Sequence, residues 1–283
     1  MEIDFNNIKK AYFVGIGGIG MSAIARFFNS RGIEVLGYDR TLTQLTQSVE
    51  NEGITVFYNE EVSEIPKGID IVIYTPAIPK SNQILNYFLE NDFIVMKRAA
   101  VLGVISRSKS VIGIAGTHGK TTTSTILTHL LKAGKVDCSG FLGGIAHNFQ
   151  SNYVHGETDY VVVEADEFDR SFLHLRPEYT IVTSTDADHL DIYGEKTELN
   201  KSYTEFSELI RLRENRFYAN GKAEYIDGVS YGVSDEQADY SATITSQTSR
   251  GTHFFITKNQ EKFLDDLYIN LPGLHNLENA VGA

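Results

Sequence analysis

Residues 110–123 read SVIGIAGTHGKTTT, an apolar run that leads into a glycine loop and then into a helical pattern. This order of strand, loop and helix is the context of the P-loop, whose pattern is G-x-x-x-x-G-K-[ST]. Gly119 and Lys120 match the end of the pattern, whereas Ile114 stands in the place of its first glycine. Because Gly116 and Gly119 still allow the backbone to approach a phosphate, we interpret the loop as a variant ATP site. A solvent-exposed lysine in a glycine turn is the alternative.

The P-loop chemistry requires further oxygen or nitrogen ligands at the ends of neighbouring strands. Lys120 is expected to reach the β and γ phosphates, and the hydroxyl of Thr121 to bind Mg²⁺. The strand 160–166, YVVVEAD, ends in acidic residues, and TDADHLD follows the next strand at 179–185. The carboxyl edge of a parallel sheet is where such folds place ligands. The candidates there are Glu164, Asp166, Asp186, Asp188, His189 and Asp191. Each carboxylate taken alone is more readily explained as a solvated surface group, whereas His189 between acidic residues is the more informative candidate.

A second glycine loop lies at residues 15–20, where GIGGIG matches G-x-G-x-x-G. It follows an apolar strand at 11–16, precedes a helix that Gly32 ends, and has Asp39 at the end of the next strand. This is the context of a Rossmann dinucleotide site, in which a helix N-terminus stabilises a diphosphate. Both NAD and a UDP-sugar meet this description, and the motif alone favours NAD. A purely structural glycine turn is the remaining interpretation.

The order of predicted elements indicates two α/β domains, 1–106 and 107–283. The first alternates strands at 11–16, 33–39, 69–75 and 93–98 with helices near 21–31, 42–52 and 81–91. The second restarts the pattern with helices near 120–133 and 197–213 around the strands already named. From residue 215 the strands become short and rich in β-branched and aromatic residues, at 215–220, 241–247 and 252–258, and we expect them to be antiparallel.

Composition excludes several classes of partner. The net charge of −12, with no compensating basic run, argues against nucleic acid. Cys138 is the only cysteine, which excludes an internal disulfide and suits a reducing cytosol. The sequence has no run of about 20 apolar residues, and its start lacks the order of a signal peptide. We therefore expect a soluble cytoplasmic protein, without membrane insertion.

Five segments together resemble the Mur ligases of peptidoglycan synthesis: GIGGIGMSAIA, GTHGKTTT, VVVEADEFDRSFLHLRPE, TDADHLDIYG and PGLHNLENA. GTHGKTTT is typical of the wider superfamily with the folylpolyglutamate ligases, whereas GIGGIGMS and EADE-D-SFL point to the member that adds L-alanine. The resemblance implies a Rossmann-like UDP-sugar domain followed by a P-loop-type ATPase domain. The resemblance also implies a third domain, which would bind the amino acid. We expect that domain to be absent here and the second domain to be incomplete at its C-terminus. We expect this two-domain chain to bind its ligands weakly and to form no amide.

The resemblance also implies the reaction and the role of each matching residue. ATP would phosphorylate the carboxylate of UDP-N-acetylmuramate, and L-alanine would then displace the phosphate. Lys120 would bind the γ-phosphate, Thr121 and Glu164 would hold Mg²⁺, His189 would bind a second Mg²⁺, and His118 would lie near the substrate carboxylate. The ATP-binding set is Gly116, Thr117, His118, Gly119, Lys120, Thr121, Thr122, His275, Asn276 and Asn279, of which the last three would contact adenine. The UDP-sugar set is Gly15, Gly17, Gly18, Ile19, Gly20 and Asp39.

Three other functions remain open at this point. An NAD-dependent dehydrogenase explains the loop at 15–20 and Asp39, but it leaves Lys120 and Thr121 without a role. A nucleotide-controlled switch explains the loop at 113–123 alone. The recycling ligase, which attaches a ready-made peptide to UDP-N-acetylmuramate, shares both loops, although its first loop usually departs from GIGGIGMS.

Overall fold

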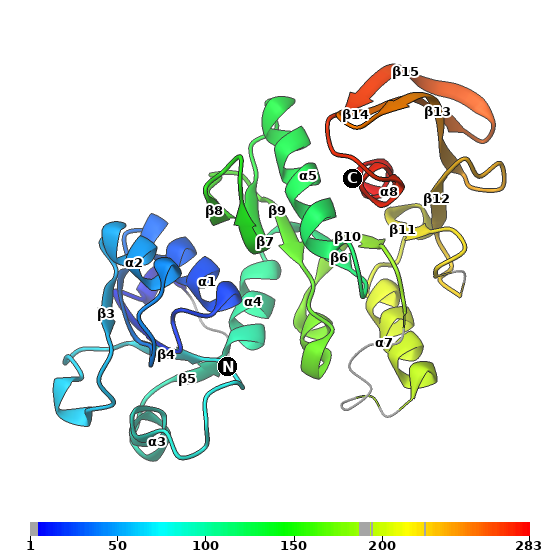
Figure 1. Cartoon of the computed structure of the whole chain (residues 1–283). Helices are drawn as coiled ribbons and strands as arrows, with labels where there is room; N and C mark the ends of the chain where they lie inside the picture. Colours follow the sequence, from blue (N-terminus) through cyan, green and yellow to red (C-terminus); the bar gives the residue numbers. More distant parts are fainter. Residues whose placement is uncertain (1–4, 187–192, 194, 224) are drawn as a thin grey trace. The chain divides into compact units, whose positions relative to one another are not determined.

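The computed structural model describes residues 5–186, 193, 195–223 and 225–283, which form two compact units (Figure 1). The first unit contains Met1–Arg107 and Phe141–His155, and the second contains Ser108–Gly140 and Gly156–Ala283. Within the described residues, no helix combines the length and the apolar character that crossing a membrane would need.

A five-stranded parallel sheet in the order β3-β2-β1-β4-β5 organises the first unit. This order reverses direction at β1, and ligands of such folds bind at the reversal, outside the carboxyl ends of the strands. The strands are β1 (Lys10–Val14), β2 (Glu34–Tyr38), β3 (Thr55–Phe57), β4 (Ile71–Tyr74) and β5 (Val95–Lys97). The helices are α1 (Ile19–Ser30), α2 (Gln44–Asn51), α3 (Gln83–Glu90) and α4 (Arg98–Ser106), with short 3₁₀ turns η1 (Phe5–Asn7) and η2 (Val62–Glu64).

Side chains of β1 alternate between the two faces of this sheet, so the strand contributes to the core on both faces. Tyr12 packs against Phe88 of α3 on one face, and Phe13 packs edge-on against Phe28 of α1 on the other. All four rings are at most 1% exposed. Each aromatic pair of this kind contributes about 0.5–1.5 kcal/mol beyond the burial of its area. The glycine loop between β1 and α1 is thus held by two well-packed elements.

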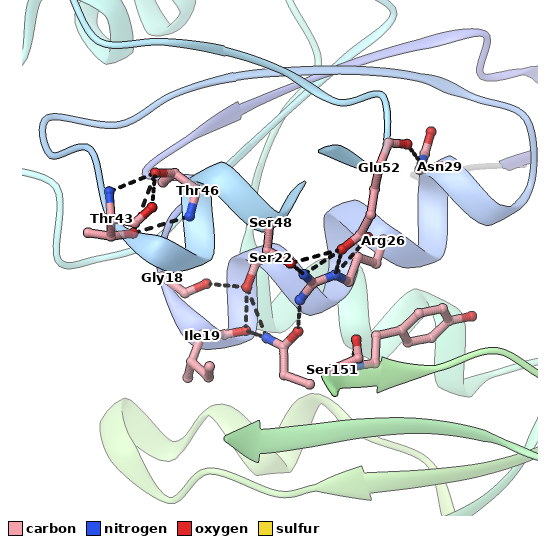
Figure 2. A network of polar contacts seen from close by, with 12 residues as sticks. Gly18, Ile19, Ser22, Arg26, Asn29, Thr43, Thr46, Ser48, Glu52 and Ser151 are labelled. Atoms are coloured by element: carbon pink, nitrogen blue, oxygen red, sulfur yellow. Dashed lines mark hydrogen bonds and ion pairs between the residues drawn. The ribbon is translucent and has the colours of Figure 1, made fainter. Parts of the chain in front are cut away.

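Helix α2 begins with a capping box. The side chain of Thr43 accepts a hydrogen bond from the backbone N–H of Thr46, and that of Thr46 accepts one from Thr43 (Figure 2). Such caps stabilise a helix by about 1 kcal/mol, because they satisfy N–H groups that lack partners within the helix. The cap fixes the start of α2 just after the end of β2.

The second unit contains a mixed sheet. Five of its strands lie side by side, each parallel to the next, in the order β12, β11, β10, β6 and β9. Beyond β12 the sheet continues with β13, β14 and β15. Its strands are β6 (Ser110–Ala115), β9 (Tyr160–Glu164), β10 (Pro177–Val182), β11 (Arg216–Ala219), β12 (Val229–Val233), β13 (Tyr240–Thr248), β14 (Gly251–Lys258) and β15 (Glu261–Ile269). Its helices are α5 (Lys120–Ala133), α7 (Lys196–Glu208) and α8 (Leu274–Gly282), with 3₁₀ segments η3 (Phe168–His174) and η4 (Arg213–Asn215).

The predicted α/β class, with a parallel first sheet and a mixed second one, is confirmed. One strand assignment was wrong: residues 215–220 were expected to be antiparallel, but β11 runs parallel to both β10 and β12. The reason is that α7 lies between β10 and β11, so the chain crosses over and returns in the same direction. The expectation holds for β13 and β14, which pair antiparallel.

Strands β7 (Ser139–Ala146) and β8 (Ser151–Val154) are hydrogen-bonded neighbours that form a hairpin. Although the hairpin lies between α5 and β9 in the sequence, its residues 141–155 group with the first unit. The first unit is therefore built from two separate stretches of the chain. The predicted domains, 1–106 and 107–283, were contiguous, and we keep them as a proposal about domain limits in the sequence.

Candidate functional site

The loop between β6 and α5 is shaped by glycine and by the end of the neighbouring strand β10. Gly116 has φ +130°, and a Cβ there would lie 2.8 Å from the backbone N of Ser184 and 2.9 Å from its O. The backbone N–H of Thr117 donates to the Ser184 carbonyl at 2.9 Å, and that of His118 donates to the Ser184 hydroxyl at 2.8 Å. The hydroxyl of Thr183 donates to the His118 carbonyl. Only glycine fits this close approach of two backbones.

Helix α5 begins directly after this loop, with Gly119 at φ +87° as its N-cap. Glycine has no side chain to cap the first N–H groups of the helix. These groups and the positive end of the helix dipole form an environment that favours an anion such as a phosphate. The loop therefore has the geometry that the P-loop interpretation predicted.

Lys120, the first residue of α5, is held by a buried carboxylate. Its Nζ lies 2.8 Å from Oε1 of Glu167 and donates to the Gly116 carbonyl at 2.6 Å. The Glu167 side chain is 2% exposed and that of Lys120 is 15% exposed. The backbone carbonyl of Glu167 accepts a hydrogen bond from the hydroxyl of Tyr193, whose pKa is raised by burial. The ammonium group is thus fixed at the loop rather than free in solvent.

Glu167 was not among the predicted site residues. It lies three residues after Glu164 in the segment EADEFD, where the acidic pattern was read as a source of metal ligands. A buried carboxylate needs a cationic partner, and the nearby P-loop lysine is such a cation. The burial of Glu167 is visible only in the structure, so no signal in the sequence singles it out from the other acidic residues of this segment.

Two oxygen-bearing side chains meet beside this lysine. The hydroxyl of Thr121 donates to Oε1 of Glu164 at 3.1 Å, which joins α5 to the carboxyl end of β9. Glu164 is one of the six candidates at the strand ends, and it lies beside the loop as expected for the carboxyl edge of the sheet. Over the described residues, no group of three or more His, Cys, Asp or Glu side chains is arranged to hold a metal ion. His189, Asp188 and Asp191 lie outside the described residues.

His118 projects into solvent. Its Nε2 lies 3.9 Å from Oδ2 of Asp186, and both side chains are more than 60% exposed. At this exposure any attraction between the two side chains is screened by solvent and contributes little to stability. His118 is therefore available to a ligand at the mouth of the loop.

Helix α8 brings one of its three predicted residues against the glycine loop. Asn279 is 7% exposed, and its amide oxygen would lie 2.5 Å from a Cβ at Gly119. Asn276 donates from its side chain to the Pro272 carbonyl at 2.6 Å, and His275 is exposed in the first turn of α8. Thr122 is half-buried in the first turn of α5. Of the three predicted residues in α8, Asn279 is thus the one that directly adjoins the P-loop.

In the first unit, the glycine loop at 15–20 is tied to the end of β2. The backbone N–H groups of Gly15 and Ile16 both donate to the Tyr38 carbonyl, at 2.7 and 3.1 Å. The N–H of Gly17 donates to Oδ2 of Asp39 at 2.8 Å, and the other carboxylate oxygen accepts from Thr41. Asp39 thus braces the loop that it was predicted to complement.

Tight packing explains three of the loop glycines. A Cβ at Gly15, where φ is +87°, would lie 2.8 Å from Ile78, and one at Gly17 would lie 2.8 Å from the Asp39 carboxylate. A Cβ at Gly20 would lie 3.3 Å from Cζ of Arg98, the first residue of α4. Gly18 is the N-cap of α1, and Ile19 is its partly exposed first residue.

Arg98 was not among the predicted site residues. Its guanidinium lies at the N-terminal turn of α1, where the loop was predicted to bind a diphosphate. The signal that could have found it is its position, directly after β5 at the carboxyl edge of the sheet.

Comparison with known sequences places both loops in one family. Residues 10–110 match the profile described as Mur ligase family, catalytic domain, and residues 114–283 match the Mur ligase middle domain. Because the second match covers more than half of the chain, the chain belongs to the Mur ligase family.

Among its relatives, the UDP-N-acetylmuramate–L-alanine ligase of Christiangramia forsetii is 45% identical over 99% of this chain and 62% of that protein. The enzyme of the same name from Porphyromonas gingivalis is 44% identical over 98% of this chain and 63% of that protein. The chain thus spans less than two thirds of the length of these curated relatives.

Solved structures agree with this assignment. The crystal structure of UDP-N-acetylmuramate-alanine ligase MurC from Thermotoga maritima matches with a TM-score of 0.85 and 31% identity, over 96% of this chain and 63% of that one. The UDP-N-acetylmuramate:L-alanyl-gamma-D-glutamyl-meso-diaminopimelate ligase from Neisseria meningitides matches with a TM-score of 0.84, over 97% and 91% of the two chains. At 20% identity, that match shows a shared fold.

Proposed function

We propose that the full-length protein is an ATP-dependent ligase that joins L-alanine to the carboxylate of UDP-N-acetylmuramate in bacterial peptidoglycan synthesis. The observation that carries the proposal is the P-loop of the second unit, where Lys120 and the Thr121–Glu164 pair lie at the N-terminus of α5. The names of the relatives at 44% and 45% identity support the choice of substrates. We place the reaction in the cytoplasm, where ATP and UDP-activated sugars are found.

The residues at the P-loop fit ATP. Gly116 and Gly119 leave room for phosphate oxygens close to the backbone, and the first N–H groups of α5 are available as donors. Lys120 uses two hydrogen bonds to Gly116 and Glu167, and an ammonium group has a third N–H to offer. Asn279 borders the same loop and would take part in binding the nucleotide.

The residues beside the loop also fit Mg²⁺, which prefers oxygen ligands. Thr121 and Glu164 would hold it, and His189 is our proposal for a second metal ion. Bound Mg²⁺ would neutralise the charge of the phosphate oxygens.

The reaction brings two anions together, so the protein must align them and offset their repulsion. The muramoyl carboxylate takes the γ-phosphoryl group of ATP, with ADP as leaving group, and becomes an acyl phosphate. The amine of L-alanine then attacks the carbonyl carbon, and phosphate leaves as the amide forms. Lys120 and the N-terminus of α5 stabilise the charge on the transferring phosphoryl oxygens. His118, exposed at the mouth of the loop, would contact the substrate carboxylate.

The glycine loop of the first unit is the proposed site of the UDP diphosphate. The N-terminus of α1 faces this position, and Arg98 adds a cation beside Gly20. Asp39 already accepts a hydrogen bond from the backbone N–H of Gly17, so its carboxylate would lie beside the nucleotide. It would not take the place of the diphosphate. In a dehydrogenase the same loop would bind NAD. The identity of the ligand that binds there therefore distinguishes a ligase from a dehydrogenase.

A binding experiment on the 283-residue chain tests the proposal. Calorimetric titrations with UDP-N-acetylmuramate, ATP with Mg²⁺, and NADH are compared for the wild type and Lys120→Ala. We expect the wild type to bind the first two ligands but not NADH, and Lys120→Ala to lose ATP while keeping UDP-N-acetylmuramate. Binding of NADH without binding of the UDP-sugar would favour a dehydrogenase and refute the proposal.

A further inference from the structure

The hairpin of β7 and β8 shares a core with the helix of the first glycine loop. Phe141 and Tyr153 of the hairpin pack against Phe27 of α1, with ring centroids 5.5 and 6.2 Å away. All three rings are buried. The hairpin is therefore a packed part of the first unit, although its residues lie more than 100 positions from α1 in the sequence.

Asn152 of β8 connects this hairpin to the first two turns of α1. Its side-chain amide donates to the Ile19 carbonyl at 2.5 Å and to the Ser22 hydroxyl at 2.9 Å, and its amide oxygen accepts from Arg26. Ile19, Ser22 and Arg26 are spaced at i, i+3 and i+7, so they share one face of the helix. Asn152 is fully buried, and both amide hydrogens and the amide oxygen have partners.

Arg26 extends this network to α2. Its guanidinium donates to the carboxylate of Glu52 at 2.7 and 2.8 Å and to the hydroxyl of Ser48 at 3.0 Å (Figure 2). Arg26 is 4% exposed, so its charge is neutralised by Glu52 within the fold. The network holds α1, α2 and β8 in one arrangement.

The first turn of α1 is the part of the network that adjoins a predicted ligand. Ile19 and Gly20 belong to the glycine loop, and the N-cap of α1 is Gly18, which has no side chain to fix the start of the helix. Ser22 donates to the carbonyls of Gly18 and Ile19 at 3.0 Å, and Asn152 holds Ser22 in turn. Asn152, from a distant stretch of the chain, thus holds the first turn of α1 through the Ile19 carbonyl and the Ser22 hydroxyl.

We propose that Asn152 is a positioning residue for the UDP-sugar site: from the hairpin, it fixes the first turn of α1, whose N–H groups receive the diphosphate. The inference rests on the proposed function of this loop. A site of this kind binds well when its donors are held in place before the ligand arrives, because less freedom is lost on binding.

The test compares Asn152→Ala and the milder Ser22→Ala with a control, Asn29→Ala, in the 283-residue chain. Asn29 lies on the same helix and donates to the Glu52 carbonyl at 3.0 Å, but it is remote from the glycine loop. Hydrogen exchange of residues 19–26 is measured by mass spectrometry, and affinities for UDP-N-acetylmuramate and for ATP with Mg²⁺ by calorimetry.

We expect Asn152→Ala and Ser22→Ala to speed exchange in the first turn of α1 and to weaken UDP-N-acetylmuramate binding about tenfold, with ATP binding unchanged. The variant with both substitutions should lose less affinity than the two single losses combined, because the Asn152–Ser22 hydrogen bond is common to both. Asn29→Ala should match the wild type in both measurements.

Two results would overturn the inference. One is unchanged exchange and unchanged UDP-sugar affinity in Asn152→Ala. The other is an equal loss of affinity for both ligands in all three variants, which would indicate a general loss of stability. If the wild type itself does not bind UDP-N-acetylmuramate, the proposed function fails, and hydrogen exchange alone decides whether Asn152 braces α1.

Discussion

The glycine loop of the second unit provides the sharpest test of how backbone geometry builds the proposed ATP site. Gly116→Ala introduces a Cβ at φ +130°, a conformation that L residues rarely adopt. The same Cβ would lie within 2.9 Å of the Ser184 backbone, which is anchored by hydrogen bonds from Thr117 and His118 and cannot move without breaking them. The conformational strain costs about 1–3 kcal/mol and the overlap about as much again. We expect a loss of about 3 kcal/mol in the stability of the second unit.

Gly221→Ala is the matched control. Gly221 has φ +73°, and no described atom lies within 4 Å of a Cβ placed there. This variant carries the conformational cost alone, about 1 kcal/mol. The difference between the two variants, about 2 kcal/mol, measures the contact of the loop with the end of β10.

Cys138 can report the unfolding of the second unit directly, because this single cysteine is fully buried and belongs to that unit. Its reaction with a thiol reagent during a urea titration reports the opening of that unit. At a typical urea dependence of about 2 kcal/mol per M, the midpoint for Gly116→Ala should lie about 1 M below that for Gly221→Ala. Equal midpoints for the two variants would refute the steric argument.

Three further predictions concern single side chains. Thr121→Val removes the hydroxyl that donates to Glu164. This variant should bind ATP about tenfold more weakly in the presence of Mg²⁺ but not in its absence. Calorimetry with and without Mg²⁺ checks this, and an equal loss of ATP affinity under both conditions would exclude a role for Thr121 in binding the metal. The side chain of Lys132 and two backbone N–H groups lower the pKa of Asp137 from 3.8 to about 2. A lowered folded-state pKa adds stability that is present above about pH 4 and is lost as the pH falls toward 2; urea titrations across this range should show a smaller loss in Asp137→Asn than in the wild type, and parallel curves would contradict the assignment. Burial raises the pKa of the Cys138 thiol, so the native protein should react with a thiol reagent far more slowly than the urea-unfolded chain, and rapid native reaction would show that the thiol is open to solvent.

The two glycine loops could be predicted from sequence because their signals are local. In each case an apolar strand, glycines and the start of a helix follow one another within about 20 residues, as the motifs require. The contact between Thr121 and Glu164 was also predictable, since the carboxyl ends of neighbouring parallel strands meet at one edge of the sheet. The resemblance to the Mur ligases joined these features into one family.

Features that depend on distant packing were not predicted. The docking of the hairpin on α1 depends on Asn152, Phe141 and Tyr153, none of which is marked by a motif or by periodicity. The parallel direction of β11 is set by the crossover through α7, whereas the β-branched and aromatic composition of the strand says nothing about direction. The ion pair of Glu167 with Lys120 required knowledge that the carboxylate is buried.

We propose that the two glycine loops serve one ligase reaction, and phosphate release by the full-length protein tests this most directly. The assay supplies ATP with Mg²⁺, UDP-N-acetylmuramate and one amino acid or peptide at a time. We predict phosphate release only when UDP-N-acetylmuramate and L-alanine are both present, and none with Lys120→Ala. Release that does not depend on the UDP-sugar, or that requires a peptide in place of L-alanine, would contradict this account.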